Sequence, residues 1–226
     1  MLQVLLGTGE AGKTSLLNAL SGQRKPLTTK LHRTIHVEIR EFDMHRENGL
    51  PSIKIKAYDF GGQETYALGQ SQYYDDNGIY ILVINADEED DQLVIAHLKR
   101  LRANSPNAVV LLVLSKADRL GSSETKLEKV ASIQDVVRKF NDDASAATAS
   151  VCCPITTDVN VISVMDNPTE AKHKILAAIR NFISKEASLF PSIDMTLPQS
   201  WLECIKFTDV VCSNGTDDHK IIDVSS

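Results

Sequence analysis

The chain has no long apolar run, and this absence excludes several classes of protein. None of its apolar stretches approaches the ~20 residues that a membrane-spanning helix needs. The N-terminus lacks a basic segment followed by a long apolar stretch, so no signal peptide is predicted. Leu2 and the C-terminal Ser225-Ser226 indicate neither myristoylation nor prenylation. We therefore expect a cytoplasmic protein with no membrane anchor.

Positive charge is also scarce. The 24 Lys and Arg residues are outnumbered by 30 Asp and Glu residues, which gives a net charge of −6. This balance disfavours non-specific binding to nucleic acid or to an anionic membrane. The content of hydrophobic residues, 42%, is ordinary for a globular protein, and 226 residues suffice for one domain with a short appendage.

Cysteine is rare and lies only in the last third of the chain. The four cysteines have no C-x-x-C spacing; they are Cys152, Cys153, Cys204 and Cys212. A metal site built from Cys204, Cys212 and His219 remains an alternative, but reduced thiols without a ligand role are the favoured interpretation. This usage is typical of a reducing cytosol.

Apolar runs alternate with amphipathic stretches over the first 186 residues. Strands are expected at 2–6, 36–43, 51–58, 79–86, 108–114 and 159–164, and helices at 13–21, 90–104, 124–141 and 169–186. The second and third strands are expected to form a hairpin. The pattern predicts an α/β fold, a doubly wound, mostly parallel six-stranded sheet with helices on both faces. The helix at 124–141 should bury one stripe: Leu127, Val130, Ile133, Val137 and Phe140.

The most informative motif is G-x-x-x-x-G-K-[ST], which stands between the first strand and the first helix. Its glycines let the backbone curl until several N–H groups point at one anion, and the helix adds its positive dipole end. Lys13 supplies charge for the β- and γ-phosphates, and Thr14 offers a hydroxyl to Mg²⁺. The expected nucleotide-binding residues here are Gly7, Gly9, Glu10, Ala11, Gly12, Lys13, Thr14 and Ser15.

A second motif, Asp59-Phe60-Gly61-Gly62-Gln63, follows the strand at 51–58. Asp59 can hold Mg²⁺ through water, Gly62 can offer its N–H to the γ-phosphate, and Gln63 can orient an attacking water. Thr34, 21 residues after Lys13, is a candidate ligand of Mg²⁺ and the γ-phosphate, although a plain residue at a strand start is almost as good a description. The expected catalytic residues are Gln63 and Lys13, and the expected metal ligands are Thr14, Thr34 and Asp59.

A third motif, Ser115-Lys116-Ala117-Asp118, ends the strand at 108–114 and resembles the [NT]-K-x-D corner with which GTPases bind the base. The Asp118 carboxylate can accept hydrogen bonds from N1 and N2 of guanine, a pairing that adenine cannot offer, while the stem of Lys116 packs over the base. Ser115 is a short side chain for this corner. Ser163 and Val164, at the end of the last strand, are expected to support the base.

In order and spacing, these motifs resemble those of Ras-like GTPases over residues 1–186. The run Asp59-Phe60-Gly61-Gly62-Gln63-Glu64-Thr65-Tyr66, followed by Gln72-Tyr73-Tyr74, is similar to the D-F-G-G-Q-E-x-Y…Q-F-F run of the Roc (Ras of complex proteins) domain. Residues 197–202 resemble the segment where a Roc domain passes into its COR partner. The resemblance implies a GTPase domain at 1–186 and a linker with the start of a truncated COR-like segment at 187–226. His36 and Ser115 depart from the family pattern.

The resemblance implies a switch that binds GTP or GDP with Mg²⁺, hydrolyses GTP slowly, and signals through loops near 28–36 and 60–76. Its implied partners are guanine nucleotide and protein effectors or other domains of a larger Roc-COR protein, and a homodimer is left open. One alternative is a nucleotide-bound scaffold or dimerisation module with negligible hydrolysis. Another is an ATPase of the same loop class, which the Lys116–Asp118 corner argues against.

Overall fold

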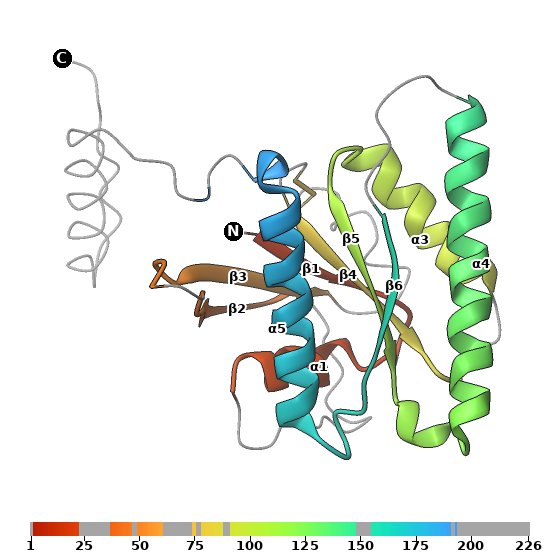
Figure 1. Cartoon of the computed structure of the whole chain (residues 1–226), viewed down its shortest axis with the longest axis horizontal. Helices are drawn as coiled ribbons and strands as arrows, with labels where there is room; N and C mark the ends of the chain where they lie inside the picture. Colours follow the sequence, from red (N-terminus) through yellow and green to blue (C-terminus); the bar gives the residue numbers. More distant parts are fainter. Residues whose placement is uncertain are drawn as a thin grey trace, which may run out of the picture. The chain divides into compact units, whose positions relative to one another are not determined.

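The computed structural model describes residues 2–22, 37–46, 49–60, 74–75, 78–87, 91–147, 155–190 and 193. Across these ranges, every helix is too short or too polar to span a lipid bilayer. The first compact unit of the chain ends at Ile193 (Figure 1). The predicted loop regions around Thr34 and Gln63, and the segment after 193, lie outside the described residues.

Six strands form one sheet in the order β2-β3-β1-β4-β5-β6. Strand β2 is antiparallel to β3, and the other neighbours are parallel. This architecture confirms the predicted mostly parallel six-stranded sheet. The strands are β1 (Leu2–Leu6), β2 (Val37–Met44), β3 (Ile53–Phe60), β4 (Ile79–Asn85), β5 (Val109–Ser115) and β6 (Ile155–Val161).

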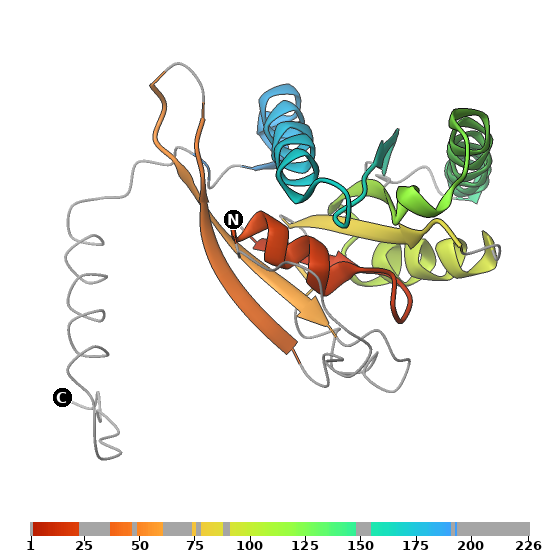
Figure 2. The same cartoon turned by 90° about the horizontal axis from the view of Figure 1, so that it is seen from below.

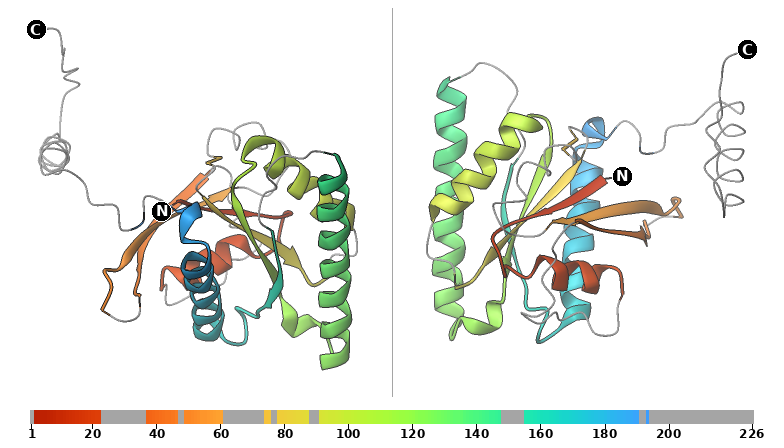
Figure 3. Two further views of the ribbon diagram at one scale, coloured as in Figure 1. Left: turned by 45° about the horizontal axis from the view of Figure 1, so that its top comes forward. Right: turned by 180° about the vertical axis from the view of Figure 1, so that it is seen from behind.

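Helices cover both faces of this sheet. They are α1 (Lys13–Leu20), α3 (Asp91–Asn104), α4 (Ser123–Ala147) and α5 (Pro168–Lys185), with short 3-10 turns η3 (Ala117–Arg119) and η4 (Ala187–Leu189). Helices α1 and α5 pack side by side, and α4 and α5 flank β6 (Figures 1 and 3). Alternate residues of β4 face opposite layers, because Ile81 joins the core under α1 and α5 while Leu82 joins the core under α3 and α4. Burial on both faces explains the continuous apolar runs of β4 and β5.

The largest differences from the prediction concern β6 and α4, which runs to Ala147 rather than ending at residue 141. Strand β6 begins at Ile155 and ends at Val161, so the prediction of 159–164 was wrong and Ser163 and Val164 lie in the loop after the strand. The polar residues 156–158 concealed the start of this edge strand. Leu127 is 70% exposed although Ile133 is buried, because α4 contacts the core only beyond its first two turns.

Strands β2 and β3 form a long, curved hairpin (Figure 2). One face of it carries Met44 and Ile55 into the core under α1 and α5. On the opposite face, the pairs Glu41–Lys56 and Asp43–Lys54 stand directly across from one another. Opposite charges in such cross-strand positions stabilise a sheet. The hairpin extends to Phe60, so Asp59 belongs to β3 itself rather than following it.

Candidate functional site

The loop between β1 and α1 has a backbone shape that depends on glycine. Gly7 has φ 139°, and a Cβ there would lie 2.2 Å from the carbonyl oxygen of Val83 on β4. Gly12, with φ 92°, is the N-cap of α1 and brings no side chain to the first-turn N–H groups. A helix N-terminus without a capping side chain favours the binding of an anion to its first-turn N–H groups. Glu10 also has a positive φ, 63°, so the loop is left-handed at a non-glycine position as well.

Lys13 lies across this loop. Its ammonium donates hydrogen bonds to the carbonyl oxygens of Gly7 at 2.9 Å and Thr8 at 2.7 Å, and the residue is 6% exposed. Burial lowers the pKa of Lys13 to about 8, while the negative charge of Asp59 acts in the opposite direction. A buried cation held by the loop that surrounds it can meet a polyphosphate directly.

Thr14 and Asp59 meet beside Lys13. The hydroxyl of Thr14 donates to a carboxylate oxygen of Asp59, which is fully buried at the end of β3. A carboxylate and a hydroxyl are hard oxygen ligands of the kind that Mg²⁺ prefers, so these two residues fit the predicted metal. In the described ranges, no three His, Cys, Asp or Glu side chains gather as a metal site. Besides Thr14 and Asp59, a Mg²⁺ ion here would take ligands from water, from phosphate and from the predicted ligand Thr34, which lies outside the described residues.

Ser115 joins the loop between β1 and α1 (residues 7–12, the predicted phosphate loop) to the end of β5. Its hydroxyl lies 2.6 Å from the carbonyl oxygen of Ala11 and 3.0 Å from that of Ile84, and the residue is 4% exposed. A hydroxyl has one proton, so the two carbonyls share one donor. The short side chain that departs from the family pattern thus makes a buried connection between the loop and the strand that leads to Asp118.

We expect Ser115→Ala to loosen the phosphate loop. The substitution removes the donor to a buried carbonyl and should lower the free energy of unfolding by about 1–3 kcal/mol. It should also speed GDP dissociation several-fold, measured by displacement of a fluorescent GDP. Ser105→Ala is the matched control: Ser105 is fully buried before β5 and bonds the hydroxyl of Tyr80. It should lose stability while keeping the dissociation rate; equal rates in both variants would contradict the connection.

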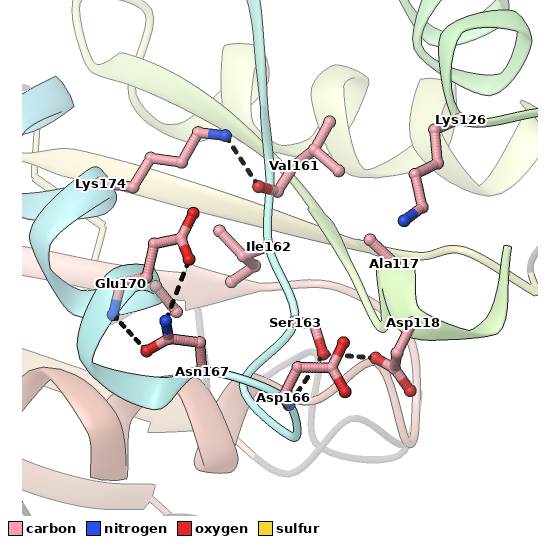
Figure 4. A pocket seen from close by; sticks show the side chains of 11 residues that line it. Ala117, Asp118, Lys126, Val161, Ile162, Ser163, Asp166, Asn167, Glu170 and Lys174 are labelled. Atoms are coloured by element: carbon pink, nitrogen blue, oxygen red, sulfur yellow. Dashed lines mark hydrogen bonds between the residues drawn. The ribbon is translucent and has the colours of Figure 1, made fainter. Parts of the chain in front are cut away.

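Asp118 and Ser163 come together at the carboxyl ends of β5 and β6. The hydroxyl of Ser163 donates to Oδ1 of Asp118 at 2.7 Å and accepts from the N–H of Asp166 at 3.1 Å. A cavity of about 180 Å³ opens beside this pair (Figure 4). Lys126 and Lys174 also line it. The Ser163 hydroxyl fixes the orientation of the predicted base-reading carboxylate.

The other predicted residues of the base corner differ in role. Lys116 is left-handed, with φ 55°, and burial and the neighbouring charge of Arg119 lower its pKa. A non-glycine residue in this conformation is held there by its surroundings, as at many functional sites. The side chain of Val164 is buried in the core under α1 and α5, so only its backbone remains for a ligand. Thr34, Gly62 and Gln63 lie outside the described residues.

Comparison with known proteins gives three findings. The model of the family described as Ras of Complex, Roc, domain of DAPkinase matches residues 3–118. The GTP-binding protein rho3 of Schizosaccharomyces pombe is 28% identical over 127 residues, which cover 55% of this chain and 60% of rho3. Leucine-rich repeat serine/threonine-protein kinase 1 of Mus musculus is 26% identical over 156 residues, which cover 66% of this chain and 8% of the kinase.

The structure is also similar to a solved one. The structure of Methanosarcina barkeri Roco2 RocCORdC bound to GDP matches with a TM-score of 0.60 at 24% identity, and the match covers 90% of this chain and 53% of that one. At 24% identity, this match shows a similarity of fold alone. The chain thus spans about half of that solved chain and a small part of the kinase.

Proposed function

The chain belongs to the Roc family of Ras-like GTPase domains, and on this basis we propose that it is a guanine-nucleotide switch that binds GTP and GDP with Mg²⁺ and hydrolyses GTP slowly. One observation carries the proposal. The hydroxyl of Ser115 bonds the carbonyl oxygen of Ala11, and Ser115 stands three residues before Asp118 in the chain. This connection supports the proposal that the predicted phosphate and base contacts form one site. Guanine is favoured over adenine because a carboxylate at Asp118 can accept from N1 and N2.

Each residue has a separate part in the proposed reaction. Lys13 and the N–H groups of the loop stabilise negative charge that develops on the transferred phosphoryl group. Thr14 and Asp59 would hold Mg²⁺, which neutralises charge on the phosphate oxygens when bound. Gln63 orients the attacking water, and Thr34 and Gly62 contact the γ-phosphate. No arginine is assigned to the transition state, and such a residue is worth ~10³–10⁵ in rate, so hydrolysis should be slow.

The relatives support a proposal for the wider role of the chain. We propose that residues 1–186 are the GTPase domain and 187–226 a linker with the start of a COR-like segment. Nucleotide-dependent ordering near 28–36 and 60–76 would then be sensed by effectors or by other domains of a larger protein. A scaffold or dimerisation module that binds nucleotide without hydrolysis is the alternative.

Two measurements test the proposal. Mass spectrometry of the nucleotide that co-purifies with the protein should find GDP or GTP. Unlabelled GDP should displace a fluorescent GDP far better than ADP does; equal displacement by ADP would remove the guanine assignment. Single-turnover incubation with GTP should release phosphate above the buffer blank at a slow rate. If it does not, the scaffold alternative holds and the enzyme assignment fails.

A further inference from the structure

The β2–β3 hairpin places a second carboxylate opposite Asp59. In the antiparallel register, Glu38 on β2 pairs directly with Asp59 on β3. Directly opposite residues point to the same face of a sheet, with Cβ atoms about 4.5–5.5 Å apart. That face is the one where Asp59 meets Thr14 of α1. Glu38 therefore lies beside the predicted Mg²⁺ site, although no motif in the sequence marks it.

Two like charges in this position need compensation, since directly opposed carboxylates destabilise a sheet. Arg40, two residues along the same face, provides it for Glu38. The guanidinium Nε donates to Oε1 of Glu38 at 2.8 Å, and Nη2 donates to the same oxygen. Nη1 donates to the hydroxyl of Ser21 after α1 at 3.2 Å. The side chain of Arg40 is 17% exposed and that of Glu38 is 37% exposed, so both charges lie partly out of water.

The negative charge of Asp59 is compensated by a different cation. Asp59 interacts electrostatically with Lys13: its negative charge raises the pKa of Lys13, against the larger lowering by burial. In the proposed function, Lys13 serves the phosphates when nucleotide binds. A bound divalent ion would then supply the positive charge beside Asp59 and Glu38. Two carboxylates attract a dication more strongly than one does, even where solvent weakens the outer contribution.

We propose that Glu38 strengthens Mg²⁺ retention from outside the coordination sphere of the ion, and that Arg40 limits this effect by neutralising it. The inference rests on the proposed nucleotide function. Glu38 is a positioning residue, because its carboxylate stays bonded to Arg40 and acts through charge.

The test is the Mg²⁺ dependence of GDP release, followed with a fluorescent GDP across a titration from excess EDTA to millimolar Mg²⁺. Glu38→Gln should raise the Mg²⁺ midpoint about three- to tenfold, because it removes one negative charge from the position opposite Asp59, where solvent weakens its effect. The release rate in EDTA should stay at the wild-type value. Glu41→Gln is the matched control: Glu41 lies on the same strand but on the opposite face, across from Lys56, and should leave the midpoint unchanged.

Arg40→Gln separates charge from structure. It breaks the same ion pair but leaves Glu38 charged, so it should lower the Mg²⁺ midpoint, opposite to Glu38→Gln. Three outcomes would each overturn the inference. Both variants could shift the midpoint in the same direction, the midpoint of Glu38→Gln could stay within twofold of the wild type, or Glu38→Gln could release GDP faster than the wild type in EDTA. If Glu38→Gln fails to fold, the direction of the Arg40→Gln shift decides alone. Absence of GDP binding by the wild type at saturating Mg²⁺ would instead remove the proposed function.

Discussion

Lys13→Ala should weaken GDP binding by about 10- to 150-fold. The ammonium of Lys13 lies 2.9 Å from the Gly7 carbonyl and 2.7 Å from that of Thr8, in the concavity where the phosphates are expected. A charge-assisted hydrogen bond contributes about 1.5–3 kcal/mol, and GDP would lose the one that Lys13 is expected to donate to its β-phosphate. Isothermal titration calorimetry with GDP at saturating Mg²⁺ measures the loss directly.

Two further variants distinguish the loss of this charge from damage to the fold. Lys13→Met keeps a long apolar stem in the buried position and should bind GDP as weakly as Lys13→Ala. Lys139→Ala removes an exposed lysine from α4 and should bind like the wild type. Thermal unfolding of all three proteins gives the stability against which binding is judged. Unchanged affinity in Lys13→Met would show that the loop does not hold the phosphates.

Asp118→Asn should shift preference from guanine to xanthine nucleotides. The Ser163 hydroxyl donates to Oδ1 of Asp118. In the variant, this donor favours the amide oxygen of Asn at the same position, so Nδ2 is left to face the base. Guanine offers two donors and would face one amide donor, whereas xanthine has an oxygen in place of the exocyclic amine. A mismatched bidentate pair costs about 1–3 kcal/mol, so GDP should bind ~5- to 150-fold more weakly while XDP gains.

Competition between GDP and XDP for the same fluorescent nucleotide gives the ratio. Asp166→Asn is the control, because it removes an exposed carboxylate that lines the same cavity but is not expected to read the base. It should retain the wild-type preference for GDP. Should Asp118→Asn retain that preference as well, the base lies somewhere other than this corner.

The parts of the fold that sequence predicts well are those whose causes are local. The phosphate-loop motif fixes both a turn and the start of α1, and the apolar runs of β4 and β5 record burial on two faces. Strand β6 was mislocated because an edge strand tolerates polar residues, here Thr156, Thr157 and Asp158. Edge position is a property of the whole sheet and leaves little trace in a short segment.

The same division applies to the candidate site. Lys13, Thr14 and Asp59 could be named from their motifs, and the structure brings them together. The contact of Ser115 with Ala11 joins residues 104 positions apart, so spacing alone could not show it. Glu38 was missed because its place opposite Asp59 depends on the register of a hairpin. Counting cross-strand pairs back from the turn at Gly49 is the one sequence-based signal that could have identified Glu38.

The close approach of Gly7 to the backbone of β4 has a consequence for kinetics. Since even a methyl group at Gly7 would collide with the Val83 carbonyl, packing against β4 restrains this end of the loop before any ligand arrives. The conformational entropy of these residues is then lost when the chain folds, and little remains to be lost on association. Capture of a phosphate tail should therefore proceed at a rate governed by encounter, with no slow rearrangement of the loop.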